Sequence, residues 1–474
     1  MRTMIYSKKM NFKKLSLNKA TAVILTIGAV LFSIGCEVPP STTTNANVVN
    51  TNTAVANTNT APVSAPVENK EAANRLPVTL PVLDAMFGEE SFAGELKTKL
   101  QLTDEQVDKL KKLSRDAVTN LNEDEAEDNP RSTRAAREGA EKQIREMLGE
   151  QKATQLFSLM RERWSSGEET AAGDSNNSTA KPGSVPTDTR IVVNAPAYRM
   201  DVFNAGKLVK SYKIGIGYPE FPLPSGMRKA DTIIFNPTWT PPDEPWVKGK
   251  VEAGKTVAAG DKLNPLGPIK IPIGLPSLIH GGKQAAKLGG FASHGCVGLT
   301  NQQVQDFAIE LGKISGLQLT PEDVKNYEKQ KTETKNVKLD KPIPVELRYE
   351  TIVVEDGKLK IFRDVYERGT NTEENLRRVL ETYGVSLDNL PEREKILAGL
   401  KQMAIDATGN PVEANTNSNS NSNSGKNNSA NSNSKNSNSA DSSVTRSIKG
   451  KKEVSFVVAE LKGKGYPAMI GQMK

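Results

Sequence analysis

Apolar residues recur at helical spacing between residues 75 and 165. One stripe contains Val107, Leu110, Leu113, Ala117 and Leu121, and a second contains Ala136, Ala140, Ile144, Met147 and Leu148. Before the first stripe, Thr103 and Gln106 stand at the spacing of a capping box, in which each side chain bonds the other residue's amide. The pattern predicts a small all-α region over 75–165, folded as a helical hairpin or bundle.

From about residue 188 the apolar period shortens to that of strands. Residues 190–194 are rich in β-branched side chains, and Tyr198, Met200 and Val202 alternate with polar neighbours. This alternation predicts a half-buried strand, which a turn at 204–206 joins to a further strand over 208–216. These elements favour a mostly β domain.

The same domain is expected to extend to residue 365, where two short apolar runs flank the turn Asp356-Gly357 and predict a hairpin. Helical spacing returns in a predicted extension over 366–411, at Leu376, Val379, Leu380 and Tyr383. The fold class is therefore multidomain α+β. A mostly β domain at 188–365 follows the small all-α region.

Three segments lack apolar periodicity and are predicted to be disordered. They are a Thr/Asn-rich tether at 36–74, a Gly/Ser/Asn/Pro linker at 166–187, and an Asn/Ser-rich linker at 412–445. A basic segment, 446–474, follows the last linker and contains an apolar stretch at 454–461. That stretch is compatible with a strand or with a short docking helix.

The N-terminus has the organisation of an export signal. Residues 1–19 carry six basic groups and no acid, and the apolar run at 20–34 is too short to span a bilayer comfortably. Residues 33–36 resemble a bacterial lipobox, whose cysteine, here Cys36, becomes the lipid-modified first residue. A plain secretory signal over 1–35 with an incidental cysteine is the alternative. We expect an exported protein of the bacterial cell envelope, anchored to the membrane by lipid and facing the periplasm.

Export also changes the net charge of the mature protein. The whole chain of 474 residues has a formal net charge of +7, but removal of residues 1–35 leaves about +1. A nearly neutral mature chain gives no reason to expect nucleic acid as a partner.

Candidate chemistry gathers around one of the two cysteines. The chain's only histidines, His280 and His294, lie within 17 residues of sequence that end at Cys296. An unpaired thiol in an oxidising compartment suggests a function, although a small buried hydrophobic residue is the plainer interpretation. A histidine can act as the base that forms the thiolate, and the amides of Gly295 and Cys296 can stabilise an oxyanion.

A zinc site is the competing interpretation, since two histidines and a cysteine are possible ligands. The region has neither CxxC nor HExxH spacing, so thiol catalysis is favoured, with no metal and no cofactor. Thr300 and Gln303 form a second capping-box pattern just after the cysteine. It predicts a helix with Val304, Phe307, Ala308 and Leu311 facing inward.

Residues from about 190 to 311 closely resemble the catalytic domain of bacterial L,D-transpeptidases of the YkuD type. The matching motifs, in order, are GIGYPEFPLPSG (215–226), NPTWTPP (236–242), NPLGP (264–268), IHG (279–281) and SHGCVGLTN (293–301). The resemblance implies a β-sandwich with short helices.

Site roles follow from this resemblance by position. Cys296 would be the nucleophile and His280 its base, oriented by the backbone carbonyl of Gly281. His294 would shape the site and polarise the oxyanion region, where the amide of Gly295 would donate.

Substrate contacts are less determined by the resemblance. Many relatives have arginine where this chain has Gly298, and Lys283 or Lys287 would be the substitute for binding a substrate carboxylate, unless both are solvated loop lysines. Ser293 is either a turn hydroxyl or a hydrogen-bonding group of the site. Trp239 and Trp246 either line the cleft or serve packing.

The implied substrate is the peptide stem of peptidoglycan, attacked at the L-centre of a diamino acid before a terminal D-amino acid. The acceptor of the resulting thioester would be another stem's amine, giving a 3-3 cross-link, or a protein lysine, giving attachment to the wall. Water as acceptor would make the protein an L,D-carboxypeptidase. A non-catalytic peptidoglycan-binding envelope lipoprotein is the rival from another class.

Overall fold

The chain is described by a computed structural model that covers residues 75–119, 121, 132–166, 181–244, 247, 249–274, 277–406, 409, 411, 444–448 and 450–471. The predicted signal at 1–35, Cys36, the tether at 36–74, Trp246 and the central parts of both predicted linkers lie outside these residues. Within them, no helix combines the length and the apolar character that a membrane crossing requires.

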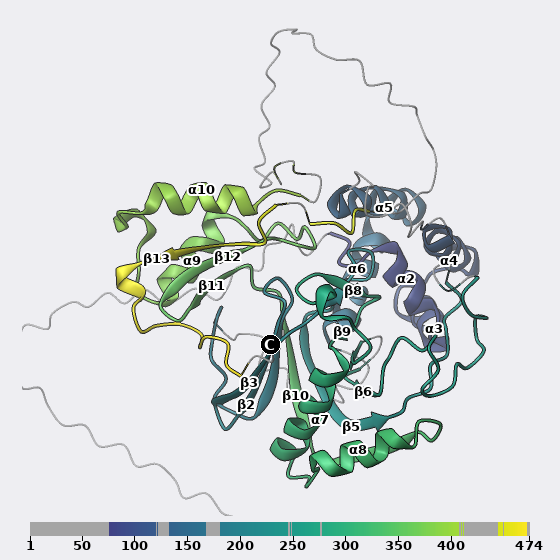
Figure 1. Ribbon diagram of the computed structural model, residues 1–474. Coiled ribbons are helices and arrows are strands. Elements are labelled where there is room, and N and C mark those ends of the chain that lie inside the picture. Colours follow the sequence, from purple (N-terminus) through teal and green to yellow (C-terminus); the bar gives the residue numbers. More distant parts are fainter. Residues whose placement is uncertain are drawn as a thin grey trace, which may run out of the picture. The chain divides into compact units, whose positions relative to one another are not determined.

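The first described region is helical, as predicted, and has its own apolar core. Its elements are α2 (Leu80–Phe87), α3 (Glu90–Lys99), α4 (Asp104–Thr119), α5 (Thr133–Leu148) and α6 (Glu150–Ser166) (Figure 1). The capping box that precedes α4 is confirmed: the Thr103 and Gln106 side chains each accept from the other residue's amide at 3.2 Å. Val107 and Leu110 of the first stripe and Ile144 of the second are buried in the core.

The mostly β region is built on an eight-stranded sheet with the order β3-β2-β1-β10-β5-β6-β7-β9. Its strands are β1 (Arg190–Asn194), β2 (Arg199–Asn204), β3 (Lys207–Lys213), β5 (Gly226–Phe235), β6 (Ile269–Pro272), β7 (Leu278–His280), β9 (Val297–Gly298) and β10 (Lys335–Arg348). A separate two-stranded pairing joins β4 (Ile216–Gly217) to β8 (Phe291–Ser293).

Helix α7 (Asn301–Ser315) covers the core side of this sheet, and α8 (Pro321–Lys329) follows it. The predicted capping box is present, because Thr300 accepts from the Gln303 amide and the Gln303 side chain accepts from the Thr300 amide. The four predicted inward residues, Val304, Phe307, Ala308 and Leu311, are all completely buried. Helix α7 thus begins directly after the cysteine motif and fixes its C-terminal side to the core.

The half-buried character predicted for β2 is wrong, since both of its faces are covered. Arg199 and Asp201, which alternation assigned to solvent, are 3% and 1% exposed and form an ion pair at 2.7 Å. The C-terminal tail covers them: the Arg199 guanidinium lies 5.0 Å from the centre of the Tyr466 ring and donates to the Pro467 carbonyl at 2.8 Å.

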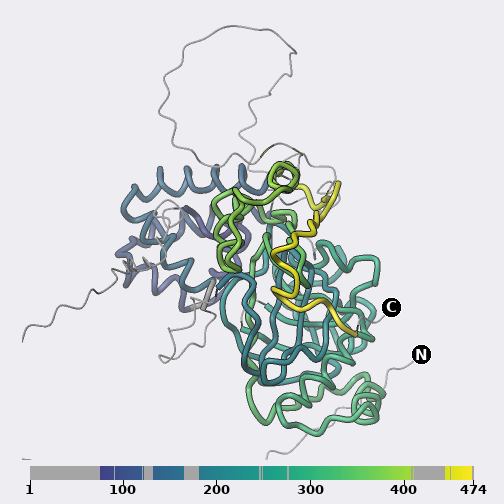
Figure 2. Tube along the Cα trace, turned by 90° about the vertical axis from the view of Figure 1, so that its left-hand side faces the viewer, coloured from purple at the N-terminus to yellow at the C-terminus, as the bar shows by residue number. Residues whose placement is uncertain are grey.

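A second, smaller sheet has the order β11-β12-β13 and includes the predicted hairpin. Its strands are β11 (Ile352–Glu355), β12 (Lys358–Phe362) and β13 (Glu453–Val457), and α9 (Glu373–Thr382) and α10 (Arg393–Met403) share its core. The tail therefore supplies a strand beside β12 (Figure 1) and, just after it, a short 3-10 turn at Ala459–Leu461. Figure 2 shows this yellow segment running beside the green part of the chain.

Candidate active site

The cysteine motif and one histidine lie together at the edge of the large sheet. Strands β7 and β9 are parallel, with Ile279 opposite Val297 and His280 opposite Gly298. Ile279 and Val297 are completely buried in the core. Because side chains alternate along a strand, His280 is placed on the opposite face, and Cys296 immediately precedes Val297 in the turn before β9.

Two serine hydroxyls hold the turn that presents Cys296. Ser293 Oγ accepts from the Cys296 amide at 3.0 Å and donates to the Cys296 carbonyl at 2.6 Å. Ser277 Oγ donates to the Gly295 carbonyl at 2.8 Å, and Gly295 has a φ of 92°, in the region that favours glycine. The Ser293 hydroxyl thus makes its hydrogen bonds within the turn. The Cys296 amide, one of the two amides expected to face an oxyanion, donates to this hydroxyl. Sequence reasoning missed Ser277, because no motif distinguishes it.

His280 is held in one tautomer and is 3% exposed. Its Nδ1 lies 2.8 Å from the Gly281 carbonyl oxygen, which can only accept, so Nδ1 carries the proton and Nε2 of the neutral ring has the lone pair. Burial lowers the pKa of His280 to about 3, and the nearby Lys283 charge acts in the same direction, against the carbonyls of Gly281 and Leu266. At neutral pH the ring is therefore an uncharged base.

Cys296 is half-buried and forms no disulfide. Burial raises the pKa of its thiol, while a backbone hydrogen bond from Leu278 and the positive charge of Lys283 lower it. The site at rest therefore combines a neutral thiol with a neutral imidazole, and not a thiolate with an imidazolium. Such a pair forms the nucleophile by proton transfer during attack.

Two aromatic rings hold His294. The centres of the Tyr218 and Phe221 rings lie 5.1 and 5.0 Å from the centre of the imidazole, both in edge-on geometry. Their loop packs closely on the cysteine turn, because a side chain at Gly217 would bring its Cβ to 2.1 Å from the Phe221 carbonyl oxygen and 3.1 Å from the Gly295 nitrogen. His294 is thereby fixed within the turn that carries Cys296.

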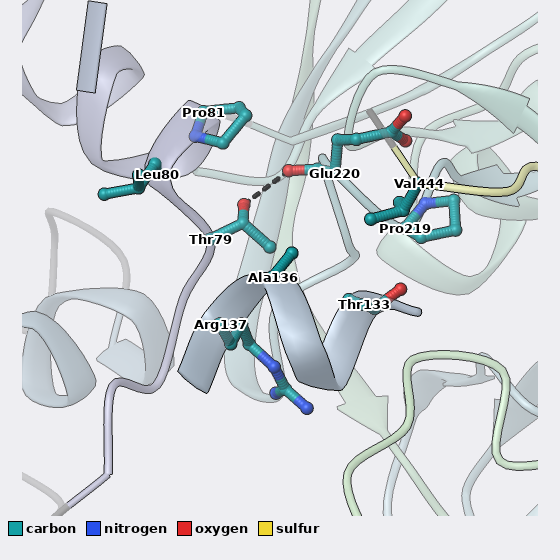
Figure 3. Close-up of a pocket in the computed structure, with 9 residues that line it drawn as sticks. All are labelled: Thr79, Leu80, Pro81, Thr133, Ala136, Arg137, Pro219, Glu220 and Val444. Carbon is teal, nitrogen blue, oxygen red and sulfur yellow. Dashed lines mark hydrogen bonds between the residues drawn. The ribbon is translucent and has the colours of Figure 1, made fainter. Parts of the chain in front are cut away.

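Three distant segments support this aromatic loop. Tyr366 donates its hydroxyl to the Gly217 carbonyl at 3.0 Å, and Arg446 pairs with the Glu220 carboxylate at 3.1 Å. Figure 3 shows the third support: the Thr79 hydroxyl, just before α2, donates to the Glu220 carbonyl at the wall of a small pocket. The helical region and the tail therefore both contact the loop that positions His294.

The remaining predicted residues lie in two different loops. Lys283 is half-buried and its side chain passes over Gly298, whereas Lys287 is exposed. Trp239 is half-buried and its backbone pairs with Val257 through hydrogen bonds of 3.1 and 2.7 Å. The structure thus brings His280, His294, Cys296 and Lys283 to one site, while Trp239 belongs to the long loop between β5 and β6.

The segment that carries these residues matches a known protein family. Residues 188–313 match the family model of the L,D-transpeptidase catalytic domain, YkuD. The resemblance predicted from the motifs is confirmed for this segment, which we call the transpeptidase domain. Among curated proteins, no sequence matches the chain.

Solved structures similar to this chain are L,D-transpeptidases. The catalytic domain from E. faecium has 16% identity over 35% of this chain and 100% of its own, with a TM-score of 0.23. An L,D-transpeptidase from Mycobacterium smegmatis has 15% identity over 34% of this chain and 58% of its own, with a TM-score of 0.21. An enzyme from Mycobacterium tuberculosis has 14% identity over 34% and 57%, with a TM-score of 0.20. The chain thus spans little more than half the length of the two mycobacterial proteins.

Proposed function

We propose that the protein is a cysteine-dependent L,D-transpeptidase that acts on peptidoglycan stem peptides. One observation carries the proposal: the hydrogen bond of 2.8 Å from His280 Nδ1 to the Gly281 carbonyl leaves Nε2 as a base, on the strand paired with β9, which Cys296 immediately precedes. The match of residues 188–313 to the transpeptidase family model supports it.

In the proposed reaction, His280 Nε2 takes the thiol proton of Cys296 as the sulfur attacks the carbonyl of the diamino acid's L-centre. The amide of Gly295 stabilises the resulting oxyanion. Collapse of the tetrahedral intermediate breaks the peptide bond, and His280 returns the proton to the departing D-amino acid. An acceptor amine then attacks the thioester and loses a proton to His280. Collapse of this second tetrahedral intermediate breaks the carbon–sulfur bond, and His280 returns the proton to the departing sulfur, which regenerates the thiol.

The neighbouring residues hold the reacting groups in place. Ser293 fixes the cysteine turn through its hydrogen bonds to the Cys296 amide and carbonyl, which favours the turn role over contact with substrate. Gly281 sets the His280 tautomer. His294, held by Tyr218 and Phe221, forms a wall beside the oxyanion. Trp239 is a candidate for the substrate cleft.

Purified protein incubated with disaccharide-tetrapeptide tests the reaction. We expect mass spectrometry to find an acyl adduct on Cys296 and free D-amino acid in solution, both absent from Cys296→Ala. Cross-linked dimers would identify an amine acceptor, and tripeptide alone would identify water. Attachment to a protein lysine would appear as a peptide-linked protein when such an acceptor is added. If folded wild type gives no adduct and behaves like Cys296→Ala, the catalytic proposal fails and the wall-binding lipoprotein replaces it.

We also propose export by residues 1–35 and membrane anchoring through lipid on Cys36. The basic and apolar pattern of that segment supports this. Detergent partitioning of wild type and Cys36→Ser provides the test. The wild type is expected in the detergent phase and the variant in the aqueous phase, and equal partitioning would overturn the anchoring.

A further inference from the structure

The residue that covers Gly298 comes from a different segment of the chain. Lys283 follows β7, and its amide donates to the Leu299 carbonyl at 3.1 Å, which ties the loop to the end of β9. A Cβ built on Gly298 would have the Lys283 side chain as its three nearest neighbours, with Cγ at 2.8 Å, Cε at 3.2 Å and Cδ at 3.4 Å. Lys283 therefore occupies the space that a side chain at position 298 would use.

Position 298 is directly coupled to the reactive groups. It lies opposite His280 in the parallel pairing of β7 and β9, and two residues after Cys296 in the sequence. A lysine lying over this glycine is thus held beside the strand that carries the proposed base and just after the turn that carries the thiol. Gly298 does not have a positive φ, so its backbone accepts an ordinary L side chain.

The charge of Lys283 and the Cys296 thiol act on each other electrostatically. It lowers the pKa of the Cys296 thiol, and the Cys296 thiolate in turn raises the pKa of Lys283, against the effect of burial. Lys283 forms no ion pair with a carboxylate among the residues that the structure describes. The other titratable or charged groups around the site include His280 on β7, His294 in the cysteine turn, and Tyr218, which packs on His294 and lies under the Arg446 guanidinium. Lys270 on β6 adds a weaker positive influence on His280.

We propose that Lys283, lying over Gly298, supplies a positive charge that stabilises the Cys296 thiolate. This assignment rests on the proposed role of Cys296 as nucleophile. The positive charge of Lys283, which acts on the half-buried Cys296 thiol, favours the anion that attack requires, whereas the neutral His280 ring supplies only a site for the proton. Lys283 is thus a positioning residue that acts through Cys296.

The test measures the rate at which iodoacetamide alkylates Cys296 between pH 6 and 10. The full chain is used, and mass spectrometry of the peptide that contains Cys296 separates its signal from Cys36. Lys283→Met keeps the bulk of the side chain and removes the charge. We expect its alkylation profile to move to higher pH and its rate at pH 7 to fall about tenfold. The exposed Lys287→Met is the matched control and is expected to follow the wild type.

Moving the positive charge from position 283 to position 298 makes the test more specific. Lys283→Ala is expected to show the same loss as Lys283→Met, and Lys283→Ala combined with Gly298→Arg is expected to recover most of the wild-type rate. Circular dichroism verifies folding for each variant. An unchanged profile in Lys283→Met, or a folded double variant no faster than Lys283→Ala, would overturn the assignment.

Turnover of disaccharide-tetrapeptide separates this inference from the proposed function. A pH shift in alkylation without any turnover in the wild type would support the role of Lys283 beside the thiol while removing the transpeptidase. Turnover in the wild type together with an unchanged alkylation profile in Lys283→Met would support the transpeptidase and overturn the role of Lys283.

Discussion

Arg446 and Glu220 form a buried ion pair at 3.1 Å although 226 residues separate them. Their side chains are 7% and 1% exposed, and the Arg446 guanidinium also lies 4.0 Å from the centre of the Tyr218 ring. Tyr218 in turn packs against His294. The tail, which follows the predicted Asn/Ser-rich linker, thus contributes a charge to the support of the candidate active site.

Loss of one partner of this pair should be strongly destabilising. Arg446→Met leaves Glu220 buried without its counter-charge, so we expect the free energy of unfolding to fall by about 3–5 kcal/mol in urea titrations. The double variant Glu220→Gln/Arg446→Met should lose less than Arg446→Met alone. Lys255→Met, which breaks an exposed pair with Glu252, is the control and should change stability by less than about 1 kcal/mol. Equal effects of the buried and exposed changes would contradict the described pairing.

Gly281 has no room for a side chain. A Cβ there would lie 2.9 Å from Val304 Cγ1 and 3.0 Å from Asn301 Oδ1, at the start of α7. We expect Gly281→Ala to reduce stability by about 1–3 kcal/mol. We also expect slower turnover, because relief of the clash moves the Gly281 carbonyl that holds the His280 ring. The matched control is Gly94→Ala in α3, where nothing lies within 4 Å of the new Cβ. For Gly94→Ala, thermal unfolding should show an increase in the free energy of unfolding of about 0.5–1 kcal/mol.

Glu244 should make stability depend on pH. Burial, together with Asp84 and Asp243, raises its pKa to about 7, while Arg115 opposes the shift. A carboxyl whose pKa is higher in the folded state than its unfolded value of about 4.5 stabilises the fold when protonated. This contribution is complete below pH 4.5 and is lost as the pH rises through about 7, for a total of roughly 3 kcal/mol.

Glu244→Gln keeps a neutral side chain at every pH, so its unfolding free energy should fall less than that of the wild type between pH 5 and pH 8. Urea titrations at the two values provide the measurement. The exposed Glu252→Gln is expected to keep the wild-type difference. The same pH dependence in Glu244→Gln and in wild type would show that another group carries it.

The attachment of β13 to α10 depends on a second glycine. A Cβ at Gly399 would lie 2.4 Å from Phe456 Cζ and 2.9 Å from Cε2. Gly399→Val should therefore displace the Phe456 ring, loosen β13 and make the tail more sensitive to limited proteolysis. Gly139→Val, in α5 with nothing within 4 Å of its Cβ, is the control and should leave cleavage of the tail unchanged.

Local patterns in the sequence determined much of this protein, because they depend on neighbours within a few residues. The two capping boxes, strand β1 over Arg190–Asn194 and the hairpin around Asp356-Gly357 all form where they were predicted. Five short motifs in a fixed order, which end with the cysteine motif, likewise predicted a transpeptidase domain, since the residues of each motif are contiguous in the chain.

Tertiary structure alone decided the features that join distant segments. Alternation along β2 predicted one solvated face, but Tyr466 and Pro467 of the tail cover that face and turn Arg199 inward. The sequence left Lys283 and Lys287 as alternative substitutes for a side chain at position 298, and only the structure shows that Lys283 fills that space. Such contacts depend on how loops return to the sheet, and the period of a single strand contains no information about the segment that will pack over it.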